Sequence, residues 1–108
     1  MVNLLLSPGL LESAYEECLS YELTQANIPF ARQVPLPLIY KQVQLDCRYQ
    51  IDLIVNQILI LEIKAVDLIH PMHEAQCLTY LRLSRLPIGL ILNFNAITLK
   101  DGIRRLIL

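Results

Sequence analysis

The stretch YQIDLIVNQILILEIKA, residues 49–65, reads as two apolar β-strands that contain ionisable side chains. Asp52 lies inside the first strand, and Glu62 and Lys64 lie two residues apart near the end of the second. Side chains two apart on a strand share a face, so Glu62 and Lys64 are expected to project together. Charged groups are rarely placed in a protein interior without a partner or a function. The stretch therefore predicts a sheet with a charged cluster at one end.

Whether Asp52 and Glu62 meet depends on the loop between the two strands. A two-residue turn at residues 56–57 would place Asp52 opposite Leu61. Glu62 would then lie on the other face of the sheet, because a register change of one residue reverses every side chain. A loop with an odd number of residues, or a β-bulge, brings the two carboxylates to the same face. We therefore expect an odd loop or a bulge near residues 56–57.

Two carboxylates and one ammonium at the end of a sheet allow two interpretations. Carboxylate oxygens suit Mg²⁺ or Mn²⁺, and one or two such ligands suffice when a phosphate supplies others. In that case Lys64 would orient an attacking water or stabilise the transition state. The other interpretation is a buried ion pair of Lys64 with Asp52 or Glu62 that holds the sheet together. The excess of one carboxylate favours a missing cation.

The composition of the whole chain limits its class. Its 108 residues predict one domain, 1–108. Nine basic residues against ten acidic ones predict no general attraction to nucleic acid or membrane, so any phosphate recognition is expected to be local. The apolar runs are too short for a membrane span, and the start has no features of a signal peptide. The widely spaced cysteines (Cys18, Cys47 and Cys77) predict free buried thiols in a reducing cytoplasm.

The apolar periodicity along the chain predicts two helices and at least four strands. A helix from Ser7-Pro8 to about Gln25 should bury a face that recurs every three or four residues. That face comprises Leu11, Ala14, Tyr15, Cys18, Leu19, Glu22 and Leu23. The strands are expected at 32–40, where two prolines indicate an edge, and at 45–55, 58–65 and 88–94; a second helix is expected at 71–85, and a short strand or helical end closes the chain. The order α-β-β-β-α-β predicts an α/β fold, a mixed sheet flanked by helices.

An ordered set of motifs resembles a known family. GLLESAY at 9–15 matches G-x-x-E-x-x-Y through Gly9, Glu12 and Tyr15. Together with Asp52, the run Glu62-Ile63-Lys64, HEAQCLTYL (73–81) and ILNFN (91–95), the chain resembles the bacterial GxxExxY protein family of the PD-(D/E)xK nuclease superfamily. The resemblance covers nearly the whole chain and implies a restriction-endonuclease-like core.

The resemblance also implies roles for two further residues. Glu12 on the first helix would approach the metal beside Asp52 and Glu62. Gln76 and Tyr80 form a Q-x-x-x-Y like that of RecB-like nucleases, in which the Gln helps place the attacking water or the DNA. At i and i+4 these two side chains share one face of the helix. Ile51 stands where the superfamily name has Pro, and this position supplies no ligand.

Members of the family that the chain resembles carry a longer apolar helix before this Gly, whereas here only MVNLLLS stands before Pro8 and Gly9. Either the start is truncated or the fold lacks a packing layer. The expected result is exposed apolar surface near Leu4, Leu5 and Leu6, which would favour a homodimer. Without the family, Glu12, Glu16 and Glu17 would be an ordinary solvated helix face. His73 is expected at the start of the second helix and Cys77 in the core.

These observations predict a metal-dependent nuclease-like domain, a Mg²⁺- or Mn²⁺-dependent phosphodiesterase with DNA as its expected substrate. Asp52 and Glu62, helped by Glu12, would hold the metal; Lys64 would assist the nucleophilic water, and Gln76 would position it. The alternative is a catalytically inactive nuclease fold that serves as a binding or oligomerisation module. A third interpretation is a structural homodimer whose interface contains the charged network.

Overall fold

The computed structural model of the protein describes residues 8–95 and 102–108, and describes side chains at all of these except residues 8–10 and 46–48. The described residues form two helices and five strands. In chain order these are α1 (Pro8–Gln25), β1 (Phe30–Tyr40), β2 (Val43–Val55), β3 (Leu59–Lys64), α2 (Pro71–Ser84), β4 (Ile88–Asn93) and β5 (Ile103–Ile107). The expected α-β-β-β-α-β order is confirmed, and the end of the chain adds the strand β5.

The five strands form one mixed sheet in the order β1-β2-β3-β4-β5. β3 and β4 pair in parallel, and the other neighbours pair antiparallel. A parallel pair needs a long crossover connection, and α2 supplies it. The sheet is therefore built from two antiparallel parts joined by one β-α-β unit.

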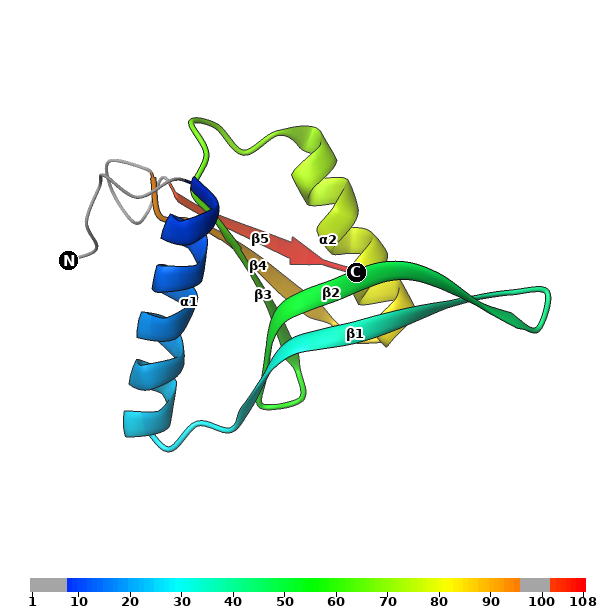
Figure 1. Ribbon diagram of the computed structural model, residues 1–108, viewed down its shortest axis with the longest axis horizontal. Coiled ribbons are helices and arrows are strands. Elements are labelled where there is room, and N and C mark those ends of the chain that lie inside the picture. The colour runs from blue at the N-terminus through cyan, green and yellow to red at the C-terminus, as the bar shows by residue number, and fades with distance from the viewer. Residues whose placement is uncertain (1–7, 96–101) are drawn as a thin grey trace.

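The helices cover opposite faces of the sheet, as Figure 1 shows. The core beneath α2 contains Ile51, Ile60, Cys77, Leu81 and Ile91. The core beneath α1 is formed by the following side chains: Leu53, Val55, Leu61 and Ile63 from the sheet, with Tyr15, Leu19 and Leu23 from the helix. Burial on both faces explains why β3 reads as a continuous apolar run. Neither described helix is long and apolar enough to span a membrane.

The inward face of α1 differs from the expected one at four positions. Cys18 and Glu22 are exposed, so their assignment to the buried face was wrong. Glu16 and Ser20 are buried instead, with 7% and 6% of their surface exposed. The carboxylate of Glu16 is satisfied by side chains of β1, which allows the polar residue to face the sheet. Ser7, expected at the start of this helix, lies outside the described residues.

β1 lies at the edge of the sheet, as its two prolines predict. β1 and β2 pair as a long ribbon, which continues beyond α2 in Figure 1. Lys41 and Gln42 form its two-residue turn, and both have positive φ (49° and 68°). These angles belong to the turn types that match the twist of a hairpin.

The loop between β2 and β3 contains three residues. Val55 pairs with Leu59, and Leu53 pairs with Leu61. The backbone N–H of Ile58 donates to the carbonyl of Val55 at 3.1 Å and closes the loop. The expectation of an odd loop is confirmed, and extension of this register places position 52 opposite position 62.

β4 packs tightly under α2. Gly89 leaves no room for a side chain, because a Cβ there would lie 2.7 Å from the Sγ of Cys77. Cys77 is fully buried, as expected. Burial along β4 alternates: Gly89, Ile91 and Asn93 are buried, whereas the residues between them are half-buried. The half-buried Leu90 and Leu92 pack against the core beneath α1, so both faces of β4 carry core side chains.

Candidate functional site

The candidate site lies where β2 and β3 stop pairing through their backbones. The ladder between the two strands extends from Val55 to Leu53. At the next position the backbone N–H of Asp52 donates to Oε1 of Glu62 at 3.3 Å. In the other direction, the backbone N–H of Ile63 donates to Oδ2 of Asp52 at 2.8 Å. Side-chain carboxylates thus occupy hydrogen-bonding positions between the strands, and Asp52 and Glu62 meet there as predicted.

The same point is a local irregularity in the sheet. Leu53 packs in the core beneath α1, whereas Ile51 packs in the core beneath α2. Residues two apart on a regular strand would share a face. In β1, Gln33 lies opposite this position with a φ of 49°, in the left-handed region that a non-glycine residue rarely adopts. The irregularity of both strands gives Asp52 access to side chains of α1 as well as of β3.

Burial disfavours the charged form of both carboxylates, and the charge of Asp52 further disfavours that of Glu62. Glu62 has only 4% of its surface exposed. This burial, with the nearby charge of Asp52, raises the pKa of Glu62 to about 8. Burial is also the main cause that raises the pKa of Asp52, although the N–H of Ile63 opposes it. At neutral pH and without a cation, Glu62 therefore holds a proton.

The raised pKa of Glu62 predicts that the metal-free protein becomes less stable as pH increases. Between the ordinary pKa of 4.5 and the folded value of about 8, the folded protein holds a proton that the unfolded chain has released. Protonation therefore favours the folded state, and this stabilisation is lost through that window. Urea unfolding in a chelating buffer from about pH 5.5 to about pH 8.5 should show a loss of a few kcal/mol.

A Glu62→Gln variant provides the matching test, because its neutral amide keeps an oxygen for the Asp52 N–H. Most of the pH slope should disappear, and the variant should be more stable than the parent at the alkaline end. Glu22→Gln, an exposed change on α1, is the control and should leave the slope unchanged. An equal slope in the parent and Glu62→Gln would contradict the assigned pKa.

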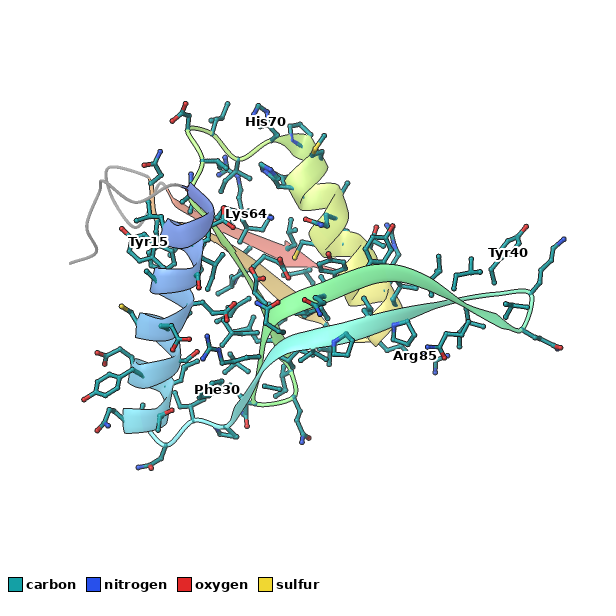
Figure 2. The ribbon with its side chains drawn as sticks, viewed as in Figure 1. Tyr15, Phe30, Tyr40, Lys64, His70 and Arg85 are labelled. Carbon is teal, nitrogen blue, oxygen red and sulfur yellow. The ribbon has the colours of Figure 1, made fainter. Side chains whose placement is uncertain are left out.

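Lys64 supplies the positive charge at the end of β3. Its ammonium acts against the raised pKa values of both Asp52 and Glu62. The backbone there is fixed, because the N–H of Phe94 donates to the Lys64 carbonyl at 2.9 Å and Asn93 holds both backbone groups of Val66. Figure 2 labels Lys64 between the two helices. Within the described part of the chain, no salt bridge joins its ammonium to a carboxylate.

Glu12 faces inward, as the motif implied. Its Oε2 accepts a hydrogen bond from the N–H of Ala65 at 3.3 Å. It also lines a hollow of about 320 Å³ together with Asp52. Tyr15, one turn further along α1, stacks on Phe94 with ring centroids 4.3 Å apart. This aromatic contact explains the spacing of the motif, because it holds α1 against the end of β4 and so keeps Glu12 near the cluster.

The sequence interpretation missed Glu16 and Gln33. The Gln33 amide donates to Oε1 of Glu16 at 2.6 Å and approaches Oδ1 of Asp52 at 3.5 Å. Arg32 donates to the other oxygen of Glu16 from two nitrogens, at 3.1 and 2.8 Å. Glu16 was assigned to a solvated face, which was wrong. Its spacing of four residues from Glu12 was the available signal, since such pairs share a helix face.

Removal of the Arg32 guanidinium should destabilise the protein, because the buried carboxylate of Glu16 loses its main partner. We expect Arg32→Met to lower the free energy of unfolding by about 1–2 kcal/mol, less than for a fully buried pair, since 33% of the Arg32 side chain is exposed. Glu17→Ala is the matched control, because it removes the exposed partner of the same arginine and should have no measurable effect. Equal melting temperatures for the parent and Arg32→Met would show that this contact is unimportant.

Gln76 does not join the carboxylate cluster in this conformation. Its side-chain amide donates to the hydroxyl of Tyr80 at 3.0 Å, which confirms that the two share a helix face. Both line a separate hollow on the α2 side. His73 lies in the first turn of α2, as expected, and its Nδ1 accepts a hydrogen bond from the N–H of His70 at 3.1 Å. That hydrogen bond at the start of α2 gives His73 a structural role there.

The chemistry of the carboxylates fits a divalent cation. Asp52 and Glu62 are hard oxygen donors that lie close together, with Glu62 buried and Asp52 half-buried, and burial is the main cause that raises the pKa of both. Within residues 8–95 and 102–108, no three acidic, His or Cys side chains form a ready-made metal cage. Two carboxylates still suffice for an ion that also takes ligands from phosphate and water. The residues therefore fit a site that is completed by substrate.

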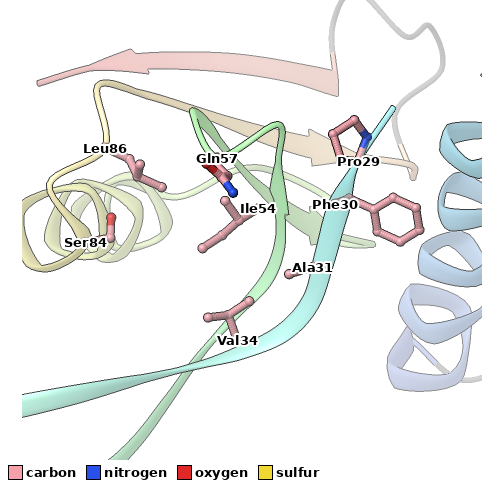
Figure 3. A pocket seen from close by; sticks show the side chains of 8 residues that line it. All are labelled: Pro29, Phe30, Ala31, Val34, Ile54, Gln57, Ser84 and Leu86. Carbon is pink, nitrogen blue, oxygen red and sulfur yellow. The ribbon is translucent and has the colours of Figure 1, made fainter. Parts of the chain in front are cut away.

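A further hollow of about 410 Å³ lies between β1, the β2–β3 loop and the end of α2, and Figure 3 shows its lining. The lining residues are Pro29, Phe30, Ala31, Val34, Ile54, Gln57, Ser84 and Leu86. None of these side chains is ionisable. This apolar hollow therefore carries no acid–base or metal chemistry.

Comparison with known proteins agrees with the fold. A family model described as the PD-(D/E)XK nuclease superfamily matches residues 1–106. No curated protein and no solved structure matches the chain. The mixed sheet with a helix on each face is the restriction-endonuclease-like arrangement that the sequence predicts. The chain belongs to the PD-(D/E)XK nuclease superfamily.

Proposed function

We propose that the protein is a nuclease that needs Mg²⁺ or Mn²⁺ and hydrolyses phosphodiester bonds in DNA. The observation that carries this proposal is the pair of adjacent carboxylates, half-buried Asp52 and buried Glu62, at the point where β2 and β3 separate. An ion pair for stability alone would not need a second carboxylate with a pKa near neutrality. Such a pair gains most from a cation, and a cation beside a phosphate is the requirement of phosphodiester hydrolysis.

The residues of the cluster have separate roles in this proposal. Asp52 and Glu62 would hold the ion, with Glu12 as a further oxygen donor from α1. When bound, the ion would neutralise charge on the phosphate and make a bound water more acidic. Lys64 orients the attacking water and stabilises the negative charge that develops on the phosphate. Gln76 positions the water or the strand from α2, which requires that its amide release the Tyr80 hydroxyl.

We also infer a finer placement of the protein. The G-x-x-E-x-x-Y motif supports membership of the bacterial GxxExxY family, because Tyr15 and Glu12 both make the inward contacts that the motif implies. The free thiols of Cys18 and Cys77 support a reducing, cytoplasmic compartment. Local recognition of nucleic acid is expected, because the net charge of the chain is only −1.

A cleavage panel tests the proposed function. Purified protein is incubated with single-stranded, duplex and branched DNA and with RNA, in Mg²⁺, Mn²⁺ or chelator. The proposal expects cleavage of at least one DNA substrate that depends on the ion and is lost in Asp52→Ala. If well-folded protein cleaves none of these substrates, the proposed nuclease activity is wrong and only the fold assignment stands.

The second candidate is a catalytically inactive fold that acts as a binding or oligomerisation module. Exposed apolar side chains on the β1–β2 hairpin favour it: Ile39, Tyr40 and Val43 are 67%, 59% and 58% exposed. Such a surface suits contact with a partner or a second copy in a homodimer. The leucines expected at such a contact, Leu4, Leu5 and Leu6, lie outside the described residues. This candidate predicts no cleavage by any variant.

A further inference from the structure

A hollow of about 360 Å³ opens between β2 and the exposed side of α2. Tyr49 contributes one wall from β2, with 37% of its surface exposed. Tyr80 contributes the other from α2 and is 3% exposed; the two ring centroids lie 6.0 Å apart at an interplanar angle of 60°. Met72, which is 73% exposed, lies at the opening. The hollow is thus lined by one accessible aromatic ring, that of Tyr49, and by one buried ring, that of Tyr80, which forms its floor.

The rim of this hollow is polar. Gln76, His73 and Thr79 line it, and each can donate or accept hydrogen bonds. The Gln76 amide donates to the hydroxyl of Tyr80 at 3.0 Å, and Tyr80 itself is buried in the core. A flat ligand that is aromatic on its faces and polar at its edge matches both features. Nucleobases have this combination, and aromatic side chains bind them by stacking.

The hollow lies on the same side of the sheet as Glu62. Tyr80 packs in the same core as Ile60, which precedes Glu62 by two residues on β3. After burial, the charge of Glu62 is the next cause that raises the pKa of the Tyr80 hydroxyl, and Asp52 contributes too. On the rim, burial and then the ammonium of Lys64 lower the pKa of His73. A strand whose phosphate lay at Asp52 and Glu62 would therefore bring a neighbouring base to this hollow.

We propose that the hollow between Tyr49 and α2 binds an unpaired nucleobase of the strand that is cut. The substrate class is then single-stranded nucleic acid or a strand with an unpaired base, because a base inside a duplex keeps its faces covered unless it is flipped out. The position of the phosphate in this inference rests on the proposed function. The stacking itself does not require cleavage.

The test compares two single-stranded oligonucleotides of equal length and label, one with all its bases and one built from abasic sites. Binding is followed by fluorescence anisotropy in chelating buffer at low salt, with the intact chain and with Tyr49→Ala. Loss of one stacked base should weaken binding of the base-containing strand by about 5- to 100-fold. Binding of the abasic strand should not change between the two proteins.

Two variants control for general damage. Tyr49→Phe keeps the ring and should bind within about twofold of the parent, because stacking uses the face and not the hydroxyl. Tyr21→Ala removes a more exposed tyrosine on α1 and should change the binding of neither strand. Equal weakening of both oligonucleotides by Tyr49→Ala, or equal loss in Tyr49→Phe, would overturn the base pocket. A blunt duplex bound as tightly as the base-containing strand would also overturn it.

Failure of the base pocket is distinguishable from failure of the proposed function. Cleavage of the abasic strand with Mn²⁺ measures hydrolysis without any base contact. If the parent cuts the abasic strand and Tyr49→Ala binds both strands as the parent does, the nuclease stands and the pocket is wrong. If neither strand is cut but Tyr49→Ala loses only base-dependent binding, the pocket stands and the nuclease is wrong.

Discussion

Replacement of Asp52 by asparagine, or of Glu62 by glutamine, should lower phosphodiester cleavage by at least about 10³-fold, the upper range for one electrostatic group at a reaction centre. Either change removes one of the two adjacent carboxylates that would hold the proposed divalent ion. Each replacement also keeps the shape of the side chain, so the hydrogen bonds to the N–H groups of Ile63 and Asp52 can persist. Cleavage rates at saturating Mn²⁺ measure the effect.

The stability of the same variants separates a functional loss from a folding defect. Because burial and the neighbouring carboxylate disfavour a charge on Glu62 in the absence of metal, each neutral variant should melt at or above the parent in chelating buffer. Glu22→Gln, which changes an exposed carboxylate of α1, should leave cleavage unchanged. Retained cleavage in both site variants would exclude this cluster as the active site.

Lys64→Ala should lower cleavage by about 10²–10³-fold while metal binding persists. An ammonium is not a ligand for a cation, and its removal makes the site more negative. The expected affinity for Mn²⁺ is therefore equal to or higher than that of the parent. Cleavage kinetics and Mn²⁺ titration of the same preparation measure the two effects.

The inactive-module interpretation predicts a different result for Lys64→Ala. If the charges serve only the fold, Lys64 is the main counter-charge near Asp52 and Glu62, and its loss should lower the melting temperature strongly. Lys64→Arg keeps the charge with a different shape, so it should rescue stability in that case but restore little cleavage. A strong drop in melting temperature in Lys64→Ala with no cleavage by the parent would favour the module.

Much of the fold could be predicted because short-range patterns determine it. The prolines of β1 indicated an edge, and the apolar runs indicated strands buried beneath helices. The odd loop after β2 was predictable only from chemistry, since it is the condition for Asp52 and Glu62 to meet. The polar inward positions of α1, Glu16 and Ser20, could not be predicted from hydrophobic periodicity.

The candidate site was only partly predictable. Asp52, Glu62 and Lys64 were recognisable as charges within strands, and Glu12 through its motif. Gln33 gave no signal, because its role depends on a left-handed backbone and on the pairing of β1 with β2. Pairing between distant segments arises from the whole sheet and is not encoded in the residue type. For Gln76 the sequence motif predicted a place beside the carboxylates, but in the structure its amide contacts Tyr80 instead.

The most direct test of the central claim is calorimetric titration of the intact chain with Mn²⁺, repeated with Asp52→Ala. Near neutral pH, in buffers of different ionisation enthalpy, the parent should bind the ion and release a proton. The proton is expected because Glu62 holds one at this pH when no cation is present, and a cation displaces it. Asp52→Ala should show neither binding nor proton release. Equal binding by the two proteins would contradict the assignment of the metal to Asp52 and Glu62.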